Sequence, residues 1–196
     1  MAPQDGMAQI SSKAEDCALS TDSSPLQVQR TQLTDPAAEP LLAGLLDEYT
    51  ERYGEVATAE FAHHPPEVFS PEQCGGLILL VEQGRTVAGG AFRRFERQGI
   101  AFDVLPEAPG EPPTAEFKRI WTHAEHRRRG LARRVLAELE REAAEAGYRR
   151  VFLTTGPRQP EAVGLYLATG YTALADPGAA ERGYPFHPFV KAIGEP

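Results

Sequence analysis

The sequence predicts an α/β protein in which helices cover a mixed sheet, and three observations carry this prediction. An apolar stripe at helical spacing runs through residues 130–147, with arginines and glutamates on the opposite face. Two strand-like runs, 77–82 and 86–95, are separated only by Gln83-Gly84-Arg85, the composition of a tight antiparallel hairpin. In the rest of the chain short strand-like and helix-like segments alternate, which is typical of layered α/β proteins.

The first part of the chain predicts a strand followed by a helix. Residues 26–30 alternate apolar and polar side chains, as a half-buried strand does. Asp35-Pro36 then offers a helix N-cap with proline in the first turn, and Gly54 lies just past the expected end of that helix. The apolar positions between them recur at three- and four-residue spacing and are Leu41, Leu42, Leu45, Leu46 and Tyr49. Residues 55–70, which contain His63-His64-Pro65-Pro66, predict a loop or a broken short helix beside the ligand.

The second part of the chain predicts four more elements besides its hairpin. Prolines crowd residues 106–113 and indicate an exposed connector. Residues 115–122 have strand character, and residues 151–155 form a short apolar strand. Residues 161–169 predict a short helix that ends at the following glycine, and residues 184–192 an aromatic final strand.

Composition limits the classes of protein to consider. The 196 residues are 41% hydrophobic, which suits one core, and residues 1–25 are rich in Ser, Ala, Asp and Gln. We therefore expect a disordered tail over 1–25 and a single domain over 26–196. The formal net charge of -8 disfavours nucleic acid and anionic membranes as partners, and no apolar run approaches the roughly 20 residues that span a bilayer. Cys17 and Cys74 form no CxxC pair, which favours a reducing, cytoplasmic location.

The most informative segment runs from the strand at 115–122 through a basic turn into the helix at 130–147. The first turn of a helix presents backbone N–H groups without internal partners, and Gly130 lets an anion approach the backbone closely. Five arginines gather there: Arg127, Arg128, Arg129, Arg133 and Arg134. The junction predicts a site for a polyphosphorylated ligand. The alternatives are a solvated helix start and a nucleic-acid contact, and the sequence pI of about 5.2 disfavours the second.

Arg127-Arg128-Arg129-Gly130-Leu131-Ala132 resembles the signature of the GNAT superfamily of acetyltransferases: Gln or Arg, two residues, Gly, one residue, then Gly or Ala. Glu116 stands eleven residues before Arg127, where many members keep a catalytic glutamate. Residues 162–171 look like the family's closing motif, with Tyr166 at the position of the general acid. Residues 155–162 resemble a bacterial subgroup that acts on small molecules, with Gln159 where others have asparagine.

This resemblance implies a GNAT fold with a central sheet of about six to seven strands flanked by about four helices. It implies transfer of an acetyl group from acetyl-CoA directly to a small-molecule amine in a ternary complex, by a protein that can form a homodimer. It also implies a splayed strand whose backbone pairs with pantetheine. The implied cofactor-binding residues are Ile120, Trp121, Thr122, Arg127, Arg128, Arg129, Gly130, Leu131, Ala132, Arg133, Gln159 and Tyr166.

Two residues are candidates for the chemistry. An alkyl ammonium must lose its proton before it attacks, and the carboxylate of Glu116 could accept that proton directly or through water. The hydroxyl of Tyr166 could protonate the leaving thiolate. The plainer alternatives are an exposed Glu116 that shares a strand face with Lys118, and a Tyr166 that only packs in the core. The histidines complete no metal-ligand spacing, so we expect no metal.

Two further questions stay open at the level of sequence. A non-catalytic acyl-CoA-binding module would keep the phosphate site without the acid and base. The acceptor is named by no motif, although the overall acidity and a series of glutamates favour a cationic compound. That series is Glu48, Glu51, Glu55 and Glu60.

Overall fold

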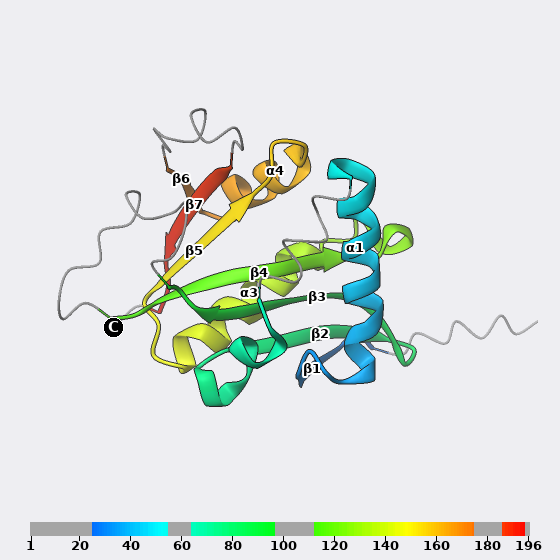
Figure 1. Ribbon diagram of the computed structural model, residues 1–196, viewed down its shortest axis with the longest axis horizontal. Helices are drawn as coiled ribbons and strands as arrows, with labels where there is room; N and C mark the ends of the chain where they lie inside the picture. Colours follow the sequence, from blue (N-terminus) through cyan, green and yellow to red (C-terminus); the bar gives the residue numbers. More distant parts are fainter. Residues whose placement is uncertain (1–24, 55–63, 97–111, 175–185, 195–196) are drawn as a thin grey trace, which may run out of the picture.

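The computed structural model describes residues 25–54, 64–96, 112–174 and 186–194. Their centre is a seven-stranded sheet with the order β1-β2-β3-β4-β5-β7-β6 (Figure 1). The strands are β1 (Gln27–Thr31), β2 (Gly76–Glu82), β3 (Arg85–Arg94), β4 (Thr114–Thr122), β5 (Arg150–Thr155), β6 (Thr172–Ala173) and β7 (His187–Ala192). All neighbours are antiparallel except β4 and β5, which are parallel, so the sheet is mixed as predicted.

Three α-helices lie in the described residues: α1 (Glu39–Tyr53), α3 (Leu131–Glu145) and α4 (Pro160–Ala168). Four 3-10 turns accompany them: Pro36–Ala38, Pro66–Phe69, Pro71–Gln73 and Ala124–His126. Helices α1 and α3 cover opposite faces of the sheet, and α4 lies beside the end of β5 (Figure 1). The expected α/β architecture is therefore confirmed.

Most elements lie where the sequence places them, and the differences have local causes. Gln83 and Gly84 both have positive φ, 50° and 73°, which is the mirror-image turn that a two-residue hairpin needs. Asp35 caps the 3-10 turn Pro36–Ala38 by accepting from the Ala37 N–H, so α1 itself begins only at Glu39. The two-residue strand β6 was not predicted, because two residues are too few to show a period.

Several expectations fall on residues outside the described ranges. These are the tail at 1–24, the loop at 55–63, most of the connector at 106–113, and the first residues of the strand expected at 184–192. Within the described part of the loop expected at 55–70, the chain forms the 3-10 turn Pro66–Phe69.

The core has two main layers, one under α3 and one under α1. The stripe of α3 is fully buried against β2, β3 and β4, with Val135 and Leu139 both 0% exposed. On the other face α1 lies directly on β4, because a Cβ on Gly44 would stand only 2.6 Å from the ring of Trp121. The end of β4 is therefore held between two helices.

Strands β4 and β5 pair over only three residues of each strand before they separate. The last pair is Glu116 with Phe152, and β4 continues for six more residues that no longer pair with β5. On its other edge β4 has a β-bulge against β3, because Ala91 pairs with Lys118 and Gly89 with Trp121. Two residues of β4 thus oppose one of β3, which is typical of a strand that is re-aimed beside a site. The wedge between β4 and β5 is the entrance to the cavity described next.

Candidate functional site

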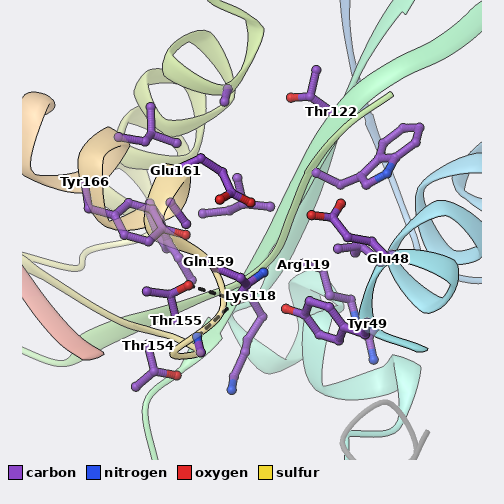
Figure 2. Close-up of a pocket in the computed structure, with 18 of the residues that line it drawn as sticks. Glu48, Tyr49, Lys118, Arg119, Thr122, Thr154, Thr155, Gln159, Glu161 and Tyr166 are labelled. Atoms are coloured by element: carbon purple, nitrogen blue, oxygen red, sulfur yellow. Dashed lines mark hydrogen bonds between the residues drawn. The ribbon is translucent and has the colours of Figure 1, made fainter. Parts of the chain in front are cut away.

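A cavity of about 760 Å³ fills the wedge between the separated ends of β4 and β5. Its walls come from α1, β4, the start of α3, the end of β5 and α4 (Figure 2). This volume lies in the range of cofactor and small-ligand sites, which are commonly lined by apolar residues with a few converging polar groups.

One end of the cavity is the N-terminus of α3. Gly130 is the N-cap with φ 78°, a left-handed conformation in which glycine is unstrained, and its missing side chain leaves the first-turn N–H groups uncovered. Arg128 also has a positive φ, 62°. The residues of the signature that line the cavity here are Arg127, Arg128, Gly130, Leu131 and Ala132, and Arg133 follows them in the lining. Backbone donors, the helix dipole and arginines therefore converge on one spot, which suits a pyrophosphate.

Arg129 stands apart from the other predicted residues of the signature. Its guanidinium donates two hydrogen bonds, 2.9 and 2.6 Å long, to the carboxylate of Glu82 on β2, and it is not part of the cavity lining. The predicted contact of Arg129 with the cofactor is thus not supported by its placement.

The second wall is the free edge of β4. Ile120, Trp121 and Thr122 line the cavity at the part of the strand that has left β5. Their backbone groups on that edge are not used by the sheet, so a ligand in extended conformation can pair with them. The splayed strand implied by the resemblance is present in the fold.

Tyr166 lies in the cavity wall on α4 and is only 6% exposed. Its ring packs against Tyr171 and Phe189, with centroids 5.7 and 5.4 Å away. Burial raises the pKa of the Tyr166 hydroxyl well above its ordinary value of 10.0, and Tyr49 adds to that shift. The hydroxyl therefore stays protonated throughout the neutral and mildly alkaline range.

Gln159 lies at the start of α4, where β5 ends. Its side-chain oxygen accepts from the Thr155 hydroxyl, at 2.9 Å, and from the Gly156 N–H, at 3.0 Å (Figure 2). Because one donor is a backbone N–H, the accepting atom must be the amide oxygen. These bonds fix the β5–α4 turn that forms this part of the wall.

Glu116 does not line the cavity. It is 6% exposed at the last β4–β5 pair, and its carboxylate lies 2.6 Å from an Arg93 guanidinium nitrogen and 3.3 Å from the Lys118 ammonium. Of these three side chains only Lys118 belongs to the lining. An amine in the cavity would meet Lys118, so the expected direct proton transfer to Glu116 is not supported by this geometry.

Glu48 is the carboxylate that the sequence did not single out for chemistry. It lies on α1 one turn after Gly44 and faces the cavity (Figure 2). Its carboxylate binds Arg52 at 2.7 Å and Arg127 at 2.9 Å. A signal was available in the sequence, because Glu48 stands three residues after Leu45 and seven after Leu41, on the apolar face of the helix. A carboxylate on the apolar face of a helix is unusual and therefore indicates a functional role.

The described residues contain neither a candidate metal cluster nor a helix that could cross a membrane. Among them no group of three or more His, Cys, Asp and Glu side chains could hold a metal ion. Within the same ranges no helix is long and apolar enough to cross a membrane.

Comparison with solved structures shows the same fold in known acetyltransferases. An acetyltransferase from Streptococcus agalactiae is 16% identical, with a TM-score of 0.60 over 86% of this chain and 98% of the other. The aminoglycoside 6'-acetyltransferase type Ii is 21% identical, with a TM-score of 0.59 over 87% and 99%. The N-acetylglutamate synthase from Neisseria gonorrhoeae, solved with coenzyme A and N-acetyl-glutamate, is 14% identical, with a TM-score of 0.56 over 86% of this chain and 36% of the other.

No curated protein matches the chain. A family model does: residues 40–171 match that of the acetyltransferase (GNAT) family. The match covers more than half of the chain, including α1, the wedge between β4 and β5, and α4. The chain therefore belongs to the GNAT family of acetyltransferases.

Proposed function

We propose that this protein transfers an acetyl group from acetyl-CoA directly to the primary amine of a small molecule, with both substrates bound at once. The observation that carries the proposal is that the wedge between β4 and β5 opens onto a cavity that ends at the uncapped N-terminus of α3. The shape admits a long ligand with an anionic end at α3 and a reactive end between the strands. Acetyl-CoA would supply an activated thioester there.

The cofactor residues would divide into two sets. The backbone from Arg128 to Arg133 would bind the pyrophosphate, and the free edge of Ile120, Trp121 and Thr122 would pair with the pantetheine amides and polarise the thioester carbonyl. Arg127 is bound to Glu48, at 2.9 Å, and would exchange that carboxylate for a phosphate.

The reaction needs an acid and a base at opposite ends of the scissile bond. As the amine nitrogen bonds to the carbonyl carbon, the carbon–sulfur bond breaks and the thiolate must be protonated. Tyr166 lines the cavity, and burial raises its pKa so that the hydroxyl keeps its proton, which supports that role. For the base we propose Glu48, because it is a carboxylate of the cavity wall and loses a partner when Arg127 turns to phosphate. We propose that Glu116 instead positions Lys118.

Three single substitutions separate these roles. We expect Glu48→Gln to lower kcat about 100-fold and to flatten the acid limb of the pH–rate profile, because the proton acceptor is lost. We expect Glu116→Gln to raise the acceptor KM with the pH profile unchanged. Glu51→Gln, on the exposed face of the same helix, is the matched control and should behave as wild type. A flattened profile in Glu116→Gln instead would return the base to Glu116.

Two of the three similar structures named above point to different acceptors on this fold. One carries the name of an aminoglycoside acetyltransferase, and the other was solved with N-acetyl-glutamate. An acceptor of either charge is therefore compatible with the family.

The rival function is a non-catalytic acyl-CoA-binding module, and turnover separates the two. The test measures thiol released from acetyl-CoA in the presence of a panel of primary amines, with mass analysis of the amine product. Release that depends on both protein and amine supports the transferase. Tight acetyl-CoA binding without any amine-dependent release across the panel would favour the binding module.

A further inference from the structure

The described lining of the cavity has more basic than acidic side chains. Two glutamates line it, Glu48 and Glu161, and both are bound by Arg52. The basic side chains of the lining are Arg52, Lys118, Arg119, Arg127, Arg128 and Arg133. The last three stand at the α3 end, where the pyrophosphate is proposed to bind. Two cations, Lys118 and Arg119, remain on β4, away from the phosphate end.

The bulge in β4 brings these two neighbours to the same side of the sheet. Strict alternation along a strand would send Lys118 and Arg119 to opposite faces. Instead, Arg119 has φ 58°, and its guanidinium lies 4.6 Å from the ring centroid of Phe69, in the layer under α1. It also donates to the His64 carbonyl at 3.2 Å. A left-handed conformation at a non-glycine residue costs about 1 kcal/mol or more, which favours a functional reason for it.

Lys118 and Arg119 differ in the groups that surround them. Lys118 lies 3.3 Å from Glu116, which in turn binds Arg93 at 2.6 Å, so one carboxylate is shared by two cations. Glu96 lies 3.6 Å from Arg93 but is 57% exposed. Burial lowers the pKa of Arg119, because removing the charged guanidinium from water costs free energy. An anionic ligand group would offset this cost.

We propose that the acceptor is an amine that also carries a carboxylate, and that Lys118 and Arg119 bind this carboxylate. This rests on the proposed function and reverses the expectation of a cationic acceptor. Of the glutamates behind that expectation, Glu48 is bound by two arginines and Glu51 is exposed, while Glu55 and Glu60 lie outside the described residues. A guanidinium offers two parallel N–H donors to a carboxylate, and the aromatic side chains of Tyr49 and Phe69 complete an amphipathic pocket for the rest of the molecule.

The test compares matched amines at saturating acetyl-CoA. L-Phenylalanine and L-methionine are each paired with their α-amide and their α-decarboxylated amine. We expect kcat/KM for at least one acid to exceed that for its amide by about 30-fold or more. This factor is the lower end of the effects seen when one partner of a buried charge pair is removed. Amidation makes the amine less basic, which by itself favours the amide, so this preference cannot come from amine basicity. Equal or better turnover of the partners that lack the carboxylate would overturn the proposal.

Variants of the same two residues provide the second arm. Arg119→Gln and Lys118→Gln should each lose at least about 10-fold in kcat/KM on the acids, at most about 2-fold on the amides, and nothing in acetyl-CoA affinity. Arg119→Lys keeps the charge and should recover part of the loss. Arg94→Gln, an exposed arginine on β3 outside the cavity, is the control. An equal loss on acids and amides would assign the two residues to structure rather than to the carboxylate.

Binding separates this proposal from the transferase proposal. If no amine is turned over, the acids are titrated calorimetrically into the CoA-saturated protein. Binding that Arg119→Gln removes would keep the carboxylate site and reject the transferase. Turnover without preference for acids would reject the carboxylate site alone, and neither turnover nor binding would reject both.

Discussion

Gly130→Glu is expected to weaken acetyl-CoA binding at least about 100-fold, because the new carboxylate stands where the pyrophosphate would bind. Gly130 is the N-cap of α3, and apart from its chain neighbours no atom of the described residues lies within 4 Å of a Cβ built on it. Within the described part of the chain nothing therefore blocks the side chain, and it would occupy the space of the ligand. Calorimetric titration with acetyl-CoA measures the loss.

The backbone of Gly130 requires a control for strain. With φ 78° the position disfavours any other residue, and a modest fall in Tm is expected for each substitution. Gly130→Asn tolerates this conformation and adds no charge. It should lose far less affinity than Gly130→Glu. Equal losses in the two variants would show that conformation, not anion binding, determines the effect.

Tyr166→Phe is expected to lower kcat about 100-fold while acetyl-CoA affinity changes less than about 2-fold. The ring contacts with Tyr171 and Phe189 remain in the variant, so only the proton donor is removed. Because burial raises the pKa of Tyr166 above 10.0, the wild-type rate should not fall from ionisation of this group as the pH rises toward 10.0. Steady-state kinetics over pH 7 to about 10 test both statements.

A neighbouring tyrosine provides the matched control. The Tyr171 hydroxyl donates to Glu140 at 3.0 Å and lies outside the cavity lining. Tyr171→Phe should therefore lower stability by about 1 kcal/mol, the usual worth of one hydrogen bond, and leave kcat unchanged. If both variants turn over at the wild-type rate, Tyr166 is a core residue rather than the acid.

The parts of the site that could be predicted are those that depend on residues close together in the sequence. The stripe of α3, the glycine before it and the position of Tyr166 all follow from local patterns, and the structure brings Gly130 and Tyr166 to one cavity. The hairpin turn at Gln83 and Gly84 is local in the same sense.

The parts that could not be predicted depend on pairing between distant segments. Whether Glu116 meets an amine or Arg93 is decided by the register of β3 against β4. The Arg129 side chain donates hydrogen bonds to Glu82, which lies 47 residues earlier in the chain. The conformation of Arg119 follows from a bulge that only the β3–β4 pairing reveals. Periodicity within one strand contains none of this information.

The most direct test of the central claim is a calorimetric titration of the unmodified protein with acetyl-CoA. We expect saturable binding of one acetyl-CoA per chain, with affinity that falls as salt screens the arginines around the start of α3. An absence of binding would contradict the proposed cofactor site, and the arginines at the α3 N-terminus would then have to serve another anion.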